Sequence, residues 1–151
     1  MTRINCAIPV EILTDEQLLA EHREIKRMPF YFTKALQTGA LSRIPLSFRL
    51  GPGHVLFFLN KQLFLYKRYI KIYTECRTRG FDVTNYEPNW LLIKSEMQEH
   101  NCWNDYEPDL SDLIQLKSRI SQRIIESKKQ AFKYYGKTVS KADAIKILNH
   151  G

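Results

Sequence analysis

The fold class is decided by residues 60–80, which read NKQLFLYKRYIKIYTECRTRG. Apolar residues recur there at spacings of three and four, which is the period of an α-helix with one buried face. They are Leu63, Tyr66, Ile70 and Tyr73. Asn60 is typical of a helix N-cap and Gly80 of the position just after a helix ends. We therefore predict a helix between them, with this stripe in the core.

Helical patterns also lie on both sides of that segment. Residues 14–17 (TDEQ) have the form of a capping box, and we expect the helix that follows to be interrupted at Pro29 and to resume towards Gly39. A third helix is expected from about Ser111 into the Lys128 region, with an apolar stripe on one face. That stripe is Leu113, Leu116, Ile120 and Ile124.

The remaining segments carry weaker signals. Residues 51–53 (GPG) predict a turn, and the apolar residues after it predict a buried passage through the core. Clear alternating strands are absent, and residues 86–109 show no regular pattern. The sequence predicts a mainly α protein: a compact single domain of about three helices with long irregular connections.

Composition and cysteine usage narrow the class of protein. The chain has 151 residues, of which 44% are hydrophobic and 26% charged, as in a soluble globular domain. It contains no apolar run long enough to cross a bilayer and no signal-peptide pattern. Three cysteines, Cys6, Cys76 and Cys102, lack metal-ligand spacing, so we expect reduced thiols in a cytosolic protein.

Charge is unevenly distributed along the chain. The net charge is +7, but residues 82–112 contain eight carboxylates and one lysine, so they sum to −7 and the rest to +14. A basic body with one acidic connection suggests a face that binds a polyanion and another turned away from it. A merely basic, solvated surface is the alternative.

Several kinds of catalytic site have no signature here. There is no glycine-rich phosphate loop, His-Glu-x-x-His motif, paired CxxC or nucleophile-elbow serine. The histidines are scattered, with none at ligand spacing from another. They are His22, His54, His100 and His150. Metal catalysis and serine or cysteine hydrolysis are therefore disfavoured, and we expect no metal or cofactor.

The N-terminus offers a different nucleophile. Thr2 is small enough for Met1 to be removed, which leaves a main-chain amine with a pKa of roughly 7.7–8.0, against about 10.4 for lysine. Such an amine forms Schiff bases without special burial. Most proteins that begin Met-Thr make no use of that amine, so this observation alone is weak.

Charged residues of the first helix could complete such a site. Glu24 is a candidate acid/base, and Arg23 and Arg27 lie together on an adjacent face. A carboxylate beside two guanidinium groups can stay ionised next to a bound phosphodiester. The alternative is an exposed helix with ordinary Glu–Arg pairs, which the residues alone favour.

Basic residues near the other end are candidate DNA contacts. Residues 132–137 (FKYYGK) interleave aromatic rings with Lys133 and Lys137, a pattern suited to phosphates and bases. Arg119 and Arg123 form an i, i+4 pair on the third predicted helix. The alternative for the aromatic residues is an anchor that packs on the core.

Four blocks together resemble the pyrimidine dimer DNA glycosylase/AP lyase family, typified by the phage enzyme endonuclease V. The blocks are 1–5 (MTRIN), 19–24 (LAEHRE), 50–55 (LGPGHV) and 133–137 (KYYGK). The resemblance extends from Met1 to about Lys137, and it implies a compact, mainly α domain. We therefore expect a glycosylase-like domain over 1–137 and a short, basic, helical extension over 138–151.

The resemblance also implies roles for single residues. The Thr2 amine would attack the sugar C1′ of the damaged nucleotide and expel the base, and β-elimination would then nick the strand. Glu24 matches the catalytic glutamate of the family. The DNA contacts implied are Arg3, Arg23, Arg27, Arg119, Arg123, Lys133 and Lys137. The expected partner is damaged double-stranded DNA, bound by a monomer without metal, cofactor or membrane.

The chain departs from the family pattern just before the last block. A Trp-Tyr pair usually precedes Lys-Tyr-Tyr-Gly, and Ala131 and Phe132 stand there instead. The change implies weaker lesion recognition or a different preferred lesion, with the lyase chemistry intact. Two alternatives stay open: the same chemistry on other base lesions, or a DNA-binding relative without catalysis.

Overall fold

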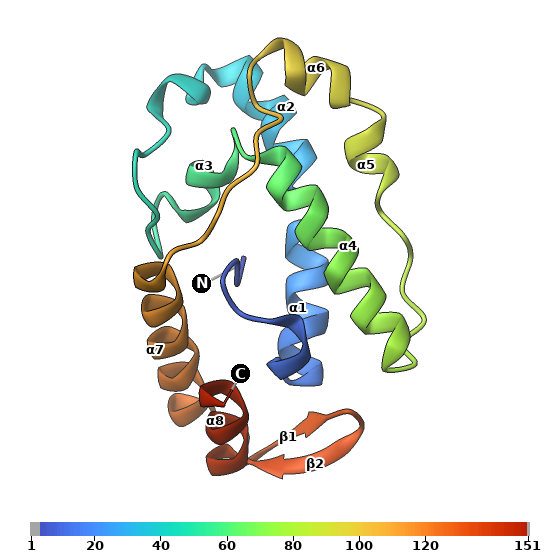
Figure 1. Ribbon diagram of the computed structural model, residues 1–151, viewed down its shortest axis with the longest axis vertical. Helices are drawn as coiled ribbons and strands as arrows, with labels where there is room; N and C mark the ends of the chain where they lie inside the picture. The colour runs from blue at the N-terminus through green and yellow to red at the C-terminus, as the bar shows by residue number, and fades with distance from the viewer. Residues whose placement is uncertain (1–3, 151) are drawn as a thin grey trace.

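The computed structural model describes residues 4–150, which form a mainly helical fold as the sequence predicts (Figure 1). Short 3₁₀ turns cover Val10–Ile12 and Ala40–Arg43. The helices and strands are α1 (Asp15–Ile25), α2 (Met28–Thr38), α3 (His54–Phe58), α4 (Gln62–Thr78), α5 (Pro88–Leu91), α6 (Lys94–Glu99), α7 (Leu110–Glu126), β1 (Ala131–Tyr134), β2 (Lys137–Ser140) and α8 (Lys141–Asn149). None of the helices within 4–150 is long and apolar enough to cross a membrane.

The first helical region forms as its local sequence predicts. The Thr14 hydroxyl accepts a hydrogen bond from the Gln17 amide, and the Gln17 side chain accepts one from the Thr14 amide, which completes the capping box. The helix is interrupted before Pro29, which sits in the first turn of α2, where its missing N–H costs nothing. Gly39 ends α2 with φ of 74°, a conformation that glycine adopts readily.

The central helix α4 differs from the prediction in its start and in its buried face. It begins at Gln62 with Lys61 as N-cap, so Asn60 is not the cap. The predicted stripe (Leu63, Tyr66, Ile70, Tyr73) is only half-buried. Fully buried instead are Leu65, Tyr69, Ile72 and Cys76. The spacing of apolar residues predicted the wrong face, because the face that is buried also carries polar residues with buried partners, among them Arg68.

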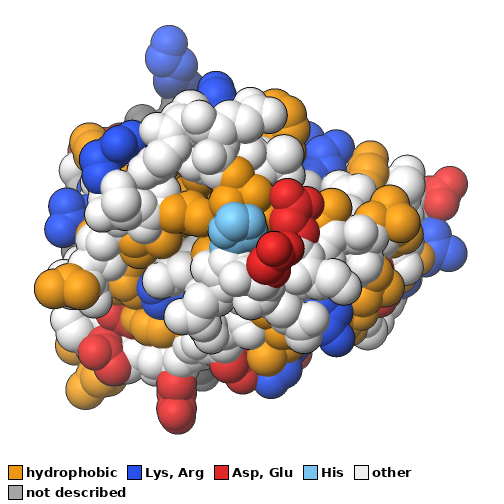
Figure 2. All heavy atoms as spheres, turned by 90° about the horizontal axis from the view of Figure 1, so that it is seen from above, with side chains coloured by type: hydrophobic (Ala, Val, Ile, Leu, Met, Phe, Trp, Pro, Cys, Tyr) orange, Lys and Arg blue, Asp and Glu red, His pale blue; other side chains and the backbone are white. Residues whose placement is uncertain are grey.

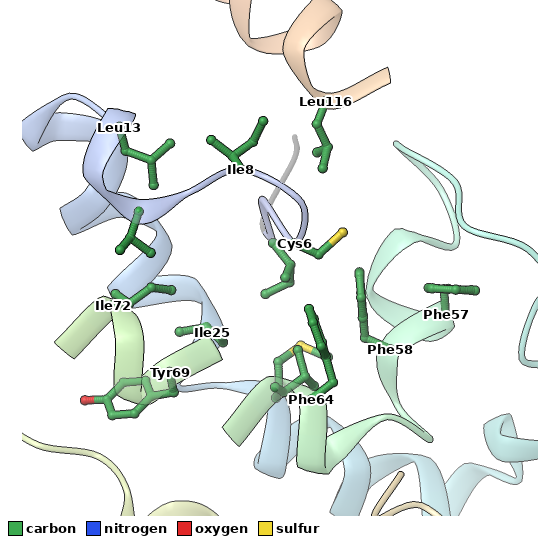
Figure 3. Packing of buried hydrophobic residues seen from close by; sticks show 14 of the residues in the cluster. Cys6, Ile8, Leu13, Ile25, Phe57, Phe58, Phe64, Tyr69, Ile72 and Leu116 are labelled. Carbon is green, nitrogen blue, oxygen red and sulfur yellow. The ribbon is translucent and has the colours of Figure 1, made fainter. Parts of the chain in front are cut away.

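The core surrounds the N-terminal segment (residues 4–13). This segment runs between α1 and α7, with Ile8 pointing towards Leu116 of α7 and Ile25 lying beside α4 (Figures 1 and 3). Ile4, Ile8 and Leu13 are completely buried. The segment is therefore held as an internal part of the core.

A β-hairpin near the C-terminal end corrects the prediction that strands are absent. β1 and β2 pair antiparallel, with Tyr134 opposite Lys137, so the turn has two residues. Tyr135 and Gly136 both have positive φ, as in a type I′ turn. Their amides donate to the Asp15 carboxylate at 3.1 and 3.0 Å, which docks the hairpin on the start of α1.

The C-terminal tail starts as a strand and continues as a helix. Residues 138–140 belong to β2, and α8 begins only at Lys141, with Ser140 as its N-cap. The expected division between 1–137 and 138–151 therefore falls inside the hairpin. Ala144 and Leu148 of α8 are buried in the same core as α7.

The acidic connection is more regular than expected. It contains α5 and α6, and the indole of Trp90, completely buried, donates to the Gln62 side chain at 3.0 Å. Figure 2 shows the end of the molecule that carries α2 and α6, opposite the hairpin. Acidic, basic and apolar side chains are intermixed on this face.

Candidate active site

Glu24 lies in the last turn of α1 with its side chain 20% exposed. The Nη1 atom of Arg27 lies 3.5 Å from Glu24 Oε2. Arg23 and Arg27 are both exposed at the same end of α1. The structure thus brings together the carboxylate and the two arginines that the sequence singles out.

The N-terminal segment is fixed to α3 through His54. The Ile4 amide donates to His54 Nε2 at 3.1 Å, and the other ring nitrogen, Nδ1, lies 2.9 Å from the Arg49 carbonyl oxygen. A backbone amide can only donate, so Nε2 must be the acceptor and Nδ1 must carry the proton. His54 is therefore neutral and buried, and it forms hydrogen bonds to the main chain at two points. Its isolated position in the sequence did not reveal this role.

A second anchor joins the same segment to α1 and α4. Asn5 Nδ2 donates to Glu21 Oε1 at 2.9 Å, and Arg68 makes two bonds to the Glu21 carboxylate at 2.9 and 3.0 Å. A third bond runs from Arg68 Nη1 to the Ile8 carbonyl at 2.6 Å. The side chains of Arg68 and Glu21 are 6% and 0% exposed.

This buried polar network had a signal in the sequence. Glu21 lies between apolar Leu18 and Ile25 on one helix, and Arg68 lies among the buried residues of α4. Opposite charges on two apolar faces indicate a buried pair, because an unpaired charge would be too costly there. Glu21 is also one turn before Glu24, so the contacts of Asn5 and Arg68 with Glu21 lie one turn from the candidate acid/base.

Thr2 and Arg3, the predicted nucleophile and one predicted DNA contact, lie outside the described residues. Between 4 and 150, no group of three or more His, Cys, Asp or Glu side chains is positioned to hold a metal ion.

Arg119 and Arg123 lie on α7, across the N-terminal segment from α1 (Figure 1). Partial burial and the positive charge of Arg119 lower the pKa of Arg123. Two guanidinium groups that repel each other in this way would be stabilised by an anion between them.

Lys133 and Lys137 lie on the hairpin, at the opposite end of α1 from Glu24. The hairpin turn is bound to Asp15, nine residues before Glu24, or about 13.5 Å along the helix axis. Lys137 is exposed, and Lys133 Nζ bonds to the hydroxyl of Thr138 at 2.7 Å. The structure does not bring these lysines to Glu24.

The tyrosines of the hairpin act as an anchor, one of the two roles considered from the sequence. Their rings cover the guanidinium of Arg79, at 4.2 Å for Tyr135 and 5.4 Å for Tyr134. The Tyr135 hydroxyl donates to Glu75, and the Tyr134 hydroxyl donates to the Glu11 carbonyl. Both rings are therefore committed to holding the hairpin on the body of the protein.

A cavity of about 450 Å³ opens between α2 and α3. Its wall on α2 includes Tyr31 and the cation of Lys34. Val55 and Leu56 of α3 form part of the opposite wall.

Residues 1–88 match the family described as pyrimidine dimer DNA glycosylase. The match covers more than half of the 151 residues. The chain belongs to this family. It is accordingly a DNA glycosylase of DNA repair that acts on pyrimidine dimers, and the resemblance seen in the sequence blocks is confirmed.

The matched segment of this glycosylase contains Glu24 and the arginines beside it. It also contains the residues that hold the N-terminal segment, which we call the N-terminal anchor: Asn5, Glu21, His54 and Arg68. It ends before α6, so Arg119, Arg123 and the hairpin lysines lie beyond it. The sequence blocks suggested a resemblance as far as about Lys137, whereas the family match extends over 1–88.

Proposed function

We propose that the glycosylase also nicks DNA as an AP lyase, with the Thr2 main-chain amine as its nucleophile. The amine nitrogen attacks C1′ of the damaged nucleotide, the C1′–base bond breaks, and the base leaves. The sugar opens to an imine between C1′ and the Thr2 nitrogen. Loss of a proton from C2′ then expels the 3′ phosphate by β-elimination, which cuts the strand.

The N-terminal anchor is the observation that supports this proposal. An extended chain spans at most about 7 Å over two residues, so the Thr2 nitrogen stays within that distance of the Ile4 amide. The Ile4 amide is bound to His54, and the next residue, Asn5, is bound to Glu21. A main-chain amine has no side-chain rotamer to position it, so fixing the following residues is the available means of orienting it.

Glu24 supplies the acid/base chemistry in this proposal. It lies one helical turn from Glu21, the residue of α1 that holds Asn5. A carboxylate at that position can accept the proton lost by the attacking amine, pass it to the ring oxygen O4′ as the sugar opens, and then accept the proton from C2′. The departing base takes its proton from water. Arg23 and Arg27 bind the flanking phosphates, and Arg27 is close enough to Glu24 to keep its carboxylate in place.

Damaged duplex DNA is bound by a monomer in this proposal. Arg3, Arg23 and Arg27 contact the backbone near the lesion, and Arg119 and Arg123 contact it from the α7 side. Lys133 and Lys137 contact phosphates further along, since the hairpin lies about 13.5 Å from Glu24 along α1. No cofactor or metal takes part in the steps proposed.

Borohydride trapping tests the chemistry directly. Protein whose Met1 has been removed is incubated with abasic-site DNA and borohydride, which reduces the imine to a stable protein–DNA adduct. An adduct that maps to the N-terminal peptide supports the proposal. The matched control is the same protein with a blocked N-terminus, which should give no adduct. If processed protein yields no adduct, the Schiff-base mechanism is wrong and a DNA-binding role without lyase chemistry remains.

Other lesions form a second candidate substrate class, favoured by Ala131 at the position where the family usually has tryptophan. Base release is compared on matched duplexes with one cyclobutane dimer, one oxidised purine or one ring-opened purine. Release from the purine duplexes would extend the substrate range.

A further inference from the structure

Phe30 is an exposed aromatic residue that lies between basic residues on the helix surface. Its side chain is 66% exposed in the first turn of α2. Lys26 and Arg27, between α1 and α2, have right-handed backbone angles, and the Tyr31 amide donates to the Arg27 carbonyl, so Arg27 leads directly into α2. Arg23, Arg27, Phe30 and Lys34 follow at spacings of four, three and four, and all four are exposed. Arg27, Phe30 and Lys34 therefore lie on one side of α2, and Arg23 lies one turn earlier in α1. We call these four residues the stripe.

The position of this stripe relative to Glu24 suits a contact near the lesion. Phe30 is six residues beyond Glu24, or about 9 Å along the helix axis. Arg27 lies between them and approaches Glu24 to 3.5 Å. A phosphate bound by the two arginines would hold the neighbouring nucleotides over Phe30.

The aromatic residues of the C-terminal block are not available for that role. Tyr134 and Tyr135 cover Arg79 at the other end of α1, and Phe132 is half-buried against the core. Ala131, the first residue of β1, carries no ring. Phe30 is thus the exposed ring in line with the arginines beside Glu24.

We infer that Phe30 contacts a nucleobase unstacked at the lesion and so contributes to the preference for damaged DNA. This inference rests on the proposed function, because it takes Arg23 and Arg27 as phosphate contacts. Rings flanked by cations are a recurrent means of binding an unstacked base, in which the cations hold the backbone and the ring packs on the base or wedges beside it. A dimer weakens stacking locally, so a damaged step exposes base surface more easily than an intact one.

The test compares the affinity of Phe30→Ala for two duplexes that differ only in one cyclobutane thymine dimer. We expect the ratio of dimer to undamaged affinity to fall roughly 5- to 150-fold, the range for loss of one base–aromatic contact. Phe30→Trp should restore the ratio. The salt dependence of binding should stay unchanged, because no phosphate contact is lost. Melting temperature is measured for each variant, since a loss of folding would change both affinities.

Leu92→Ala is the matched control. Leu92 is 83% exposed, but it lies in the acidic segment, where a polyanion is disfavoured. Its removal should leave the ratio unchanged. An unchanged ratio for Phe30→Ala would overturn the inference, as would an equal loss of affinity for both duplexes. So would a sedimentation result in which Phe30→Ala only abolishes self-association.

Trapping on abasic-site DNA separates this inference from the proposed mechanism. Phe30→Ala should still form the covalent adduct, because Thr2 and Glu24 are intact. A wild-type protein that prefers dimer DNA but forms no adduct would overturn the lyase proposal alone. A wild-type adduct combined with an unchanged Phe30→Ala ratio would overturn the role of Phe30 alone.

Discussion

Removal of Arg68 should destabilise the protein and release its N-terminal segment. In Arg68→Met, the Glu21 carboxylate, which is 0% exposed, loses two charge-assisted hydrogen bonds, and the Ile8 carbonyl loses one. Breaking a buried pair by removing one partner costs about 3–5 kcal/mol. For a chain of about this length, 1 kcal/mol lowers the melting temperature by roughly 2–4 °C, so we expect a decrease of about 6–20 °C.

Urea denaturation at pH 7 measures this change, with a surface pair as its control. Arg77 and Asp82 form a bridge of 3.1 Å, but their side chains are 51% and 102% exposed. Arg77→Met should therefore change the free energy of unfolding by less than about 1 kcal/mol. If Arg68→Met cost no more than Arg77→Met, the buried network would not be holding the segment, and our account of the anchor would be wrong.

Three further predictions concern catalysis, DNA binding and pH. Glu24→Gln should abolish strand nicking while DNA affinity stays within a few-fold; an unimpaired nicking rate would refute its assigned role. Arg123→Ala should weaken binding to all duplexes and reduce the slope of log affinity against log salt by about 0.9, the value for one phosphate, and an unchanged slope would count against that contact. Burial, aided by Lys26 and Arg23, lowers the pKa of His22 below 6.5. The unfolded state then binds more protons, so the free energy of unfolding should fall as pH drops through about 6.5, and His22→Phe should reduce that fall in a urea series.

Features encoded by neighbouring residues were predicted from the sequence. The Thr14 capping box, the interruption before Pro29 and the end of α2 at Gly39 each depend on groups within one or two turns of one another. The stripe of α7 was also predicted, from its helical spacing. Leu116, Ile120 and Ile124 are buried, and Leu113 is half-buried.

Features that depend on distant partners were missed. The hairpin turn has Tyr-Gly at its centre, which is a weak hairpin signal, and the carboxylate that binds its amides belongs to Asp15, 120 residues earlier. The buried face of α4 was predicted wrongly because an arginine in a sequence is expected to be exposed. Only the structure shows that Arg68 is paired with Glu21 in the core. The role proposed for Glu24, in contrast, comes from the family resemblance, which supplies long-range information that periodicity lacks.

The anchor also links stability to the proposed chemistry. A lysine nucleophile can be positioned by packing its own side chain, but a main-chain amine can be positioned only through the backbone that follows it. Here that backbone is held by a buried ion pair and a neutral histidine, and both are part of the folded core. Loss of either should therefore lower the rate of borohydride trapping as well as the free energy of unfolding. Arg68→Met should reduce both quantities at a temperature where the variant is still folded, and Arg77→Met should reduce neither. Such a parallel loss would mean that the core itself orients the nucleophile.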